Sequence, residues 1–213
     1  MDSDSEEEPR PSRLPENIGN AASQGDFERV KAWLAGGSAS DPRSINAGDG
    51  TVWTLLHWTM IGEQTPGHLE FARYLLSRGA QVGAKTYHGR TPLHFACEGV
   101  PGETAVAMVS MLITAGAAVN MGTRFGTTPL FSIDQLSEST IDVVTVLLRA
   151  GASLDFNDRI GETQTVPRSF EEHLDSINDN DPYGENVRHV RAIRTLVASV
   201  RAAGSWKAHC RLA

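Results

Sequence analysis

The chain has 213 residues, 40% of them hydrophobic, and a formal net charge of −7 at pH 7. That length and apolar content suffice for one sizeable domain, and the acidic balance gives no indication of nucleic-acid binding. The two cysteines, Cys97 and Cys210, match no metal or redox spacing, so we expect free thiols in a reducing compartment. We expect no secretory signal and no membrane contact, because the N-terminus is acidic and no apolar run approaches bilayer-spanning length.

Residues 1–14 come first in chain order and are strongly acidic. They hold five carboxylates against two arginines, with serine and proline between them and no apolar anchor. Such a composition buries too little apolar surface to offset the entropy lost on ordering. We therefore expect a disordered, solubilising tail. The alternative is a regulatory tail, since Ser3 and Ser5 each have an acidic residue three positions on, which suits acidophilic kinases.

Two short sequence motifs, which we call phrases, recur in fixed order along the next part of the chain. The first is Gly89-Arg-Thr-Pro-Leu-His94, with degraded copies at Trp53–His57 and Gly126–Phe131. The second follows each copy and is found at Leu75–Ala80, Leu112–Ala117 and Leu147–Ala152. Equivalent glycines in successive copies stand 35 to 42 residues apart. Recurrence at such a period indicates a repeat architecture.

The residue pattern of each unit predicts two helices. In the clearest unit, Thr91 suits the N-cap of the first helix and Pro92 suits its first position, where an N–H would have no partner. The second helix has an apolar face and ends at a glycine, namely Gly79, Gly116 or Gly151. The apolar faces are Phe27, Val30, Trp33 and Leu34; Leu69, Ala72, Leu75 and Leu76; Val106, Val109, Leu112 and Ile113; and Val143, Val144, Leu147 and Leu148. No unit can bury such a face alone, so we expect the units to stack.

The two phrases resemble those of the ankyrin repeat. The resemblance implies an all-α solenoid of stacked helix-turn-helix units with short β-hairpin fingers. We expect an ankyrin-repeat domain over 15–157, with units at about 15–47, 48–84, 85–121 and 122–157. The first unit lacks the Thr-Pro phrase, and a fifth hairpin is expected to open at Asp158–Thr163.

Two residues depart from the family pattern. Leu55 stands where proline is usual, which removes a rigid helix start. Phe131 stands where histidine is usual. In the family this histidine forms hydrogen bonds that steady the hairpin and the adjacent repeats. We therefore expect the fourth unit to lack these hydrogen bonds, which we call a polar tie.

Residues 158–213 are expected to form an atypical capping unit. The segment between Ser169 and Val187 is acidic and lacks lysine and arginine, and we interpret it as a loop. A basic helix follows, and its apolar stripe is expected to cover the end of the stack before a helix end at Ala203-Gly204. The stripe is Val190, Ile193, Leu196, Val197 and Val200. We interpret the basic face as solvated and partly paired with the acidic loop; the alternative is a docking patch for an acidic partner.

The chain shows no pattern of residues that predicts catalysis. The run from Asp179 to Gly184 fails as a calcium loop, because its fifth position is Tyr183 and its twelfth is Val190. The histidines show no paired metal-ligand spacing, and phosphate loops, nucleophile elbows and kinase motifs are missing from the sequence. Cys97 lies on a predicted inner helix without a companion base, so we interpret it as structural. We therefore expect no enzyme activity, no metal and no cofactor.

The resemblance implies that partners bind along the concave side and at the hairpin tips. Aromatic and arginine side chains are the types that anchor interfaces, and they recur at the predicted tips. The candidate partner-binding residues are Trp53, Tyr87, His88, Arg90, Arg124, Phe125 and Arg159. The alternative is that these side chains are merely exposed, and that Trp58 and Phe95 beside them serve packing alone.

The expected function is that of a non-catalytic scaffold or adaptor that binds a protein partner on this face. The alternative is the recognition arm of a larger signalling or ubiquitin-ligase-type protein whose activity lies outside this chain. We expect a monomer in the cytoplasm or nucleus that binds neither nucleic acid nor membrane.

Overall fold

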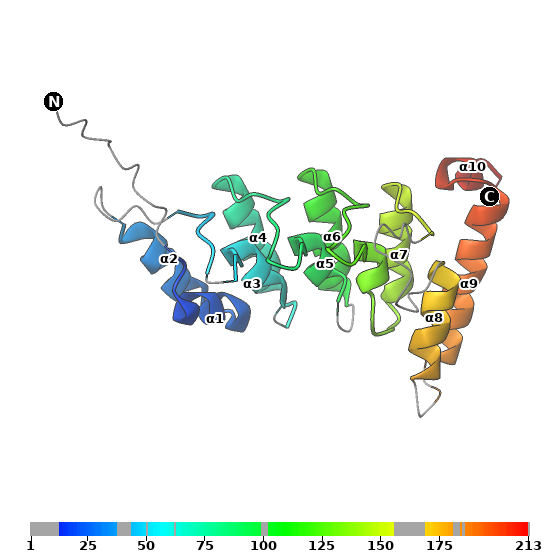
Figure 1. Cartoon of the computed structure of the whole chain (residues 1–213), viewed down its shortest axis with the longest axis horizontal. Helices are drawn as coiled ribbons and strands as arrows, with labels where there is room; N and C mark the ends of the chain where they lie inside the picture. Colours follow the sequence, from blue (N-terminus) through cyan, green and yellow to red (C-terminus); the bar gives the residue numbers. More distant parts are fainter. Residues whose placement is uncertain are drawn as a thin grey trace.

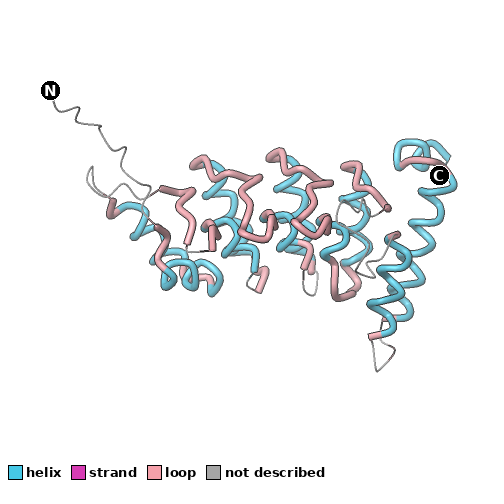
Figure 2. Tube along the Cα trace, viewed as in Figure 1, coloured by secondary structure: helices cyan, strands magenta, loops and turns pink. Residues whose placement is uncertain are grey.

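The computed structural model describes residues 13–37, 44–49, 51–61, 63–98, 102–155, 169–180, 184 and 186–212. Helices follow one another in pairs along the long axis of the molecule (Figure 1). Figure 2 shows the described residues as helix and loop only, with no strand. The pairs are α1 (Glu16–Gln24) and α2 (Phe27–Ala35); α3 (Leu55–Ile61) and α4 (Pro66–Ser77); α5 (Pro92–Ala96) and α6 (Glu103–Thr114); and the 3₁₀ helix η1 (Pro129–Ser132) and α7 (Thr140–Arg149). The chain then continues through α8 (Phe170–Asp179), α9 (Val187–Ala202) and α10 (Trp206–Leu212).

The pairs stack into a solenoid with one continuous core. The first helices pack in series, α1 on α3, α3 on α5 and α5 on η1, while α4 packs on α6 and α6 on α7. All the apolar faces predicted for the second helices are buried or pack against this core. The all-α solenoid is thereby confirmed. Among the described helices, none is long and apolar enough to cross a membrane.

Leu14 packs in the core, although its place in the acidic segment predicted that it belongs to the disordered tail. Its side chain is 1% exposed, and its N–H donates to the Gly48 carbonyl over 3.1 Å. A single leucine followed by the helix α1 is enough to anchor the chain here, because it enters the core of the first unit. Residues 1–12 of the predicted tail lie outside the described residues.

Buried histidines tie consecutive units together. The Thr91 N–H donates to His94 Nδ1 over 3.0 Å, so the proton of the neutral ring is on Nε2, which donates to the Thr127 carbonyl of the next unit over 3.0 Å. His57 bonds in the same way to the Thr54 N–H and to the Ala84 carbonyl. Burial lowers the pKa of both histidines to about 4. Both rings are therefore neutral at physiological pH, as these hydrogen bonds require.

The fourth unit is tied in a different way. Phe131 packs edge-on against Phe170 of α8, with ring centroids 5.7 Å apart. From the same helix, His173 Nε2 reaches the Ile133 carbonyl over 2.7 Å. Burial lowers the pKa of His173, so its neutral ring donates this bond. A polar tie to the fourth unit thus comes from the following helix.

Two asparagines also clasp neighbouring units. Asn46 Nδ2 donates to the Gly79 carbonyl over 3.1 Å, and its Oδ1 accepts from the Gln81 N–H over 2.8 Å. Asn120 makes the same pair of bonds to Gly151 and Ser153. Gly79 and Gly151 end their helices with φ of 89° and 91°, as predicted. The left-handed turn that ends each helix therefore presents the backbone groups that the asparagine binds.

The acidic C-terminal segment is a helix over part of its length, and the prediction of a loop is wrong there. Ser169 caps α8 by accepting the Glu172 N–H, and the acidic first turn suits the positive end of the helix dipole. Phe170, Leu174 and Ile177 are buried at helical spacing. The basic helix is confirmed as α9, whose apolar stripe packs on α7 and α8. The expected fifth hairpin and Arg159 lie outside the described residues.

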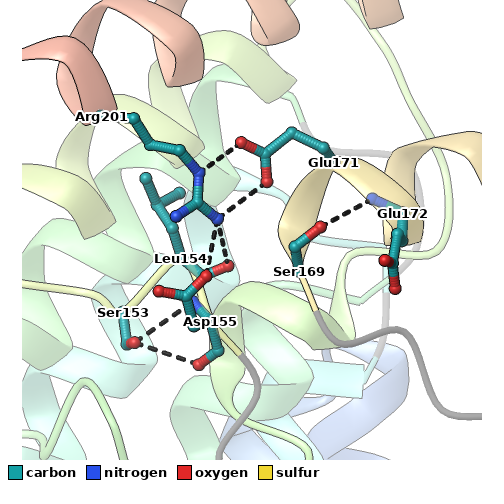
Figure 3. Close-up of polar contacts among 7 residues, drawn as sticks. All are labelled: Ser153, Leu154, Asp155, Ser169, Glu171, Glu172 and Arg201. Carbon is teal, nitrogen blue, oxygen red and sulfur yellow. Dashed lines mark hydrogen bonds and ion pairs between the residues drawn. The ribbon is translucent and has the colours of Figure 1, made fainter.

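Arg201 joins three elements at the end of the stack (Figure 3). Its Nε donates to Glu171 of α8 over 2.5 Å, and its Nη2 donates to Asp155, which follows α7 in the fourth unit, over 2.7 Å. The same Nη2 also donates to the Leu154 carbonyl over 3.3 Å. The hydrogen bonds from Arg201 lower the pKa of Glu171. The expected pairing of the acidic segment with the basic helix thus links α8 and α9 to the fourth unit.

Candidate functional site

Three tight turns precede the first helices of the second, third and fourth units. We call residues 49 and 51–53, 86–90 and 123–127 the fingers. Each is closed by two backbone hydrogen bonds, such as those from the Thr86 N–H to the Arg90 carbonyl at 2.9 Å and from the Gly89 N–H to the Thr86 carbonyl at 2.8 Å. Gly89 and Gly126 turn two of the fingers with φ of 81° and 82°, whereas Val52 occupies that position in the other with φ of 65°.

The fingers form a continuous row. The Tyr87 N–H donates to the Thr51 carbonyl over 3.2 Å, and the Arg124 N–H donates to the His88 carbonyl over 2.9 Å. Each bond joins the tip of one finger to the tip of its neighbour. We call this arrangement the finger row. Because backbone groups hold it, the side chains at the tips are presented from fixed positions.

Four of the candidate residues gather at the tips of the finger row. The Arg124 guanidinium lies over the Tyr87 ring, 4.1 Å from its centroid, and His88 meets that ring edge-on at 5.3 Å. Phe125 is the neighbour of Arg124 in sequence. Tyr87 and Phe125 are 59% and 58% exposed. We call Tyr87, His88, Arg124 and Phe125 the tip cluster.

Trp53 and Arg90 pack beside the tips, not at them as predicted. The Trp53 ring lies against Phe95 and Trp58, with centroids 4.6 and 5.2 Å away. The Arg90 guanidinium lies over the same Phe95 ring, 4.2 Å from its centroid, and pairs with Glu98 over 2.5 Å. Phe95 is buried, while Trp53, Trp58 and Arg90 are half-buried. We call Trp53, Trp58, Arg90 and Phe95 the aromatic ladder; it runs from the second unit into the third.

Asp49 organises the finger of the second unit, and its role was not predicted from the sequence. Its Oδ1 accepts from the Thr51 N–H over 2.7 Å and from the Trp53 N–H over 3.0 Å, and its Oδ2 accepts from the Trp58 indole over 3.2 Å. Burial opposes ionisation, yet these hydrogen bonds outweigh it and lower the pKa of Asp49. Asp49 is therefore charged at neutral pH. The Asp-x-Thr spacing, typical of a turn closed by an aspartate side chain, was the signal available in the sequence.

A cavity of about 460 Å³ opens at this end of the finger row. It lies between the start of α1 and the second unit, and its lining includes Glu16, Asp49, Thr51 and Trp58. Trp58 is seated on α1 at Gly19, where an added Cβ would lie 2.8 Å from the indole ring. The cavity therefore has one rigid aromatic wall and two carboxylates.

The described residues contain no cluster of three or more histidine, cysteine, aspartate or glutamate side chains that would hold a metal ion. Cys97 is fully buried, and burial raises the pKa of its thiol well above its usual range. The thiol is therefore protonated and shielded from solvent. This agrees with the structural role predicted for Cys97.

The stacked helix pairs with finger turns define a helical repeat protein of the solenoid class. Residues 18–121 match the family model for ankyrin repeats in three copies, so this part of the chain consists of ankyrin repeats. The matched residues run from α1 through α6. Ankyrin repeats are in general modules for protein–protein interaction and are typically non-catalytic.

Proposed function

We propose that this protein is a non-catalytic scaffold or adaptor that binds an extended segment of a partner protein along the finger row. The observation that carries the proposal is the position of exposed apolar side chains. The described part of the chain exposes five large hydrophobic residues, and three of them, Val52, Tyr87 and Phe125, lie on fingers. Exposed apolar side chains gathered on one feature of a folded protein are typical of an interaction site.

The tip cluster suits this role because it is organised before a partner arrives. The Tyr87 ring holds the Arg124 guanidinium in place, and the finger-to-finger hydrogen bonds fix both backbones. A side chain that is already ordered loses little further entropy on binding. Aromatic and arginine side chains of this kind supply most of the energy in protein interfaces.

The buried polar groups of the repeats support a role without catalysis. Both ring nitrogens of His57 and of His94 are hydrogen-bonded to backbone groups, and the lowered pKa of each histidine keeps its ring neutral. Neither ring has a nitrogen left for proton transfer to a substrate. These histidines therefore stabilise the stacking of neighbouring units.

The double substitution Tyr87→Ala with Arg124→Ala tests the proposal. Random twelve-residue peptides displayed on phage are selected on the wild-type protein, and the enriched peptides are resynthesised with a fluorescent label. We expect the double variant to bind them at least about tenfold more weakly, since it lacks an aromatic anchor and a cation. Circular dichroism checks that the fold is kept, and Arg29→Ala on α2 is the control. Equal affinity for a well-folded double variant would disprove the proposed site.

A further inference from the structure

We propose that the partner segment bound by the finger row carries one basic and one acidic side chain about six residues apart. The basic side chain binds at Asp49 and Trp58, and the acidic one binds Arg124. This inference rests on the proposed function and specifies the chemistry of the ligand. It follows from two fixed charges of opposite sign at the two ends of the finger row.

Arg124 supplies the positive charge. Its guanidinium rests on the Tyr87 ring, and within the described residues it has no carboxylate partner. Arg90 and Arg201 differ in this respect, since Arg90 pairs with Glu98 and Arg201 pairs with Glu171. A guanidinium with one face on an aromatic ring still presents its N–H edge, and that edge matches a carboxylate. An acidic side chain of the partner therefore fits this end.

Asp49 supplies the negative charge at the other end. Its hydrogen-bond donors are the neutral groups of Thr51, Trp53 and Trp58, and no cation of the described residues pairs with it. The cavity beside it adds the Glu16 carboxylate and one cation, Arg13, so its lining is negative overall. The indole of Trp58 forms part of the wall, and a cation is attracted to such a ring as well as to carboxylates. A lysine or arginine of the partner therefore fits the cavity.

The repeat geometry sets the spacing between the two charges. Asp49 and Trp58 belong to the second unit and Arg124 to the fourth, so the sites are two repeat intervals apart. Packed helices lie roughly 8–10 Å apart, which places the sites about 20 Å from each other. An extended chain advances about 3.3 Å per residue, so about six residues span that distance. Trp53 and Tyr87 lie between the sites and favour apolar residues in the middle of the segment.

The phage selection also tests this inference. Peptides enriched on the wild-type protein are expected to share a basic and an acidic residue about five to seven positions apart, in either chain direction, as an extended chain requires. Enriched peptides that lack this charge pair but depend on Tyr87 and Arg124 would overturn the inference and leave the proposed function intact. If no peptide depends on those two residues, the proposed function itself fails.

A charge exchange then tests each end with a labelled peptide from the selection. Replacing the acidic residue of the peptide by lysine is expected to weaken binding to the wild type at least about tenfold, and Arg124→Glu is expected to restore it. Arg29→Glu, the matched control on α2, should restore nothing. Asp49→Asn should weaken the binding of peptides that keep their basic residue and leave the binding of peptides that lack it unchanged. If Asp49→Asn melts at a lower temperature than the wild type, Glu16→Gln is used in its place. Failure of the Arg124→Glu variant to recover the lysine peptide would overturn the inference.

Discussion

At the scale of single residues, Val52 carries a strained backbone. Its φ of 65° places a β-branched residue where Gly89 and Gly126 turn the other fingers. That conformation costs an L-residue about 1–2 kcal/mol. Glycine avoids this cost, but its greater freedom in the unfolded chain lowers the gain in stability by up to about 1 kcal/mol. We expect Val52→Gly to raise the free energy of unfolding by up to about 1 kcal/mol, as measured by urea denaturation.

Gly89→Ala is the matched control for Val52→Gly. An added Cβ at Gly89 would lie 3.1 Å from the Arg124 backbone nitrogen, in a conformation with φ of 81°. We expect this variant to lose about 1–2 kcal/mol, because strain and crowding act together. A Val52→Gly variant less stable than the wild type would show that the finger of the second unit does not hold this turn in solution.

The sequence was enough to predict which side chains lie at the tips of two fingers. The tip positions of Tyr87, His88, Arg124 and Phe125 followed from their place beside the recurring phrase. The positions of Trp53 and Arg90 did not, because the Trp53 ring turns towards Phe95 of the next unit and Arg90 turns towards Phe95 and Glu98, five and eight residues away. Asp49 was missed for the same reason, since its role depends on the indole of Trp58. Contacts across a turn or between units are not visible in local spacing.

At the scale of the elements, the histidine ties make the stacking of the units sensitive to acid. The pKa of His57 and His94 is about 4 in the fold and 6.5 for the free side chain. The unfolded chain therefore binds more protons between these values, and stability falls as the pH drops through this window. Each pKa unit is worth about 1.4 kcal/mol, so each histidine is expected to cost a few kcal/mol between pH 7 and pH 4.

Urea denaturation at pH 7 and pH 5 measures this loss, and His94→Gln tests its origin. The variant is expected to be less stable than the wild type at pH 7 but to lose less stability on acidification, because one titrating group has been removed. His88→Gln, which removes an exposed histidine, serves as the control variant. An unchanged pH dependence in the His94 variant would mean that other groups cause the acid sensitivity.

The elements also show where charge misleads a prediction from sequence. The second helices were predicted correctly because their apolar spacing and terminal glycines agree. The segment that forms α8 was interpreted as a loop because of its carboxylates, although Phe170, Leu174 and Ile177 recur at helical spacing. Two of its four acidic residues, Glu171 and Glu172, stand where a helix tolerates them best, in the first turn beside the Ser169 cap. Apolar periodicity was the better guide.

At the scale of the whole molecule, the stack depends on contacts between neighbours, so damage at one end is expected to stay local. Arg201 is the residue that links α8, α9 and the end of the fourth unit. Its bonds are charge-assisted but partly exposed, so we expect Arg201→Met to weaken this end by roughly 1–2 kcal/mol. Hydrogen exchange read by mass spectrometry should show faster exchange in α7, α8 and α9.

The same measurement separates a local effect from a global one. Protection in α1, α3 and α5 is expected to be unchanged in Arg201→Met, because those helices contact one another and the other repeat helices, not α9. Arg191→Met, at an exposed position of α9 with no ion pair among the described residues, is the control and should exchange like the wild type. Uniformly faster exchange along the chain would mean that the solenoid unfolds as a single cooperative unit, and that Arg201 stabilises all of it.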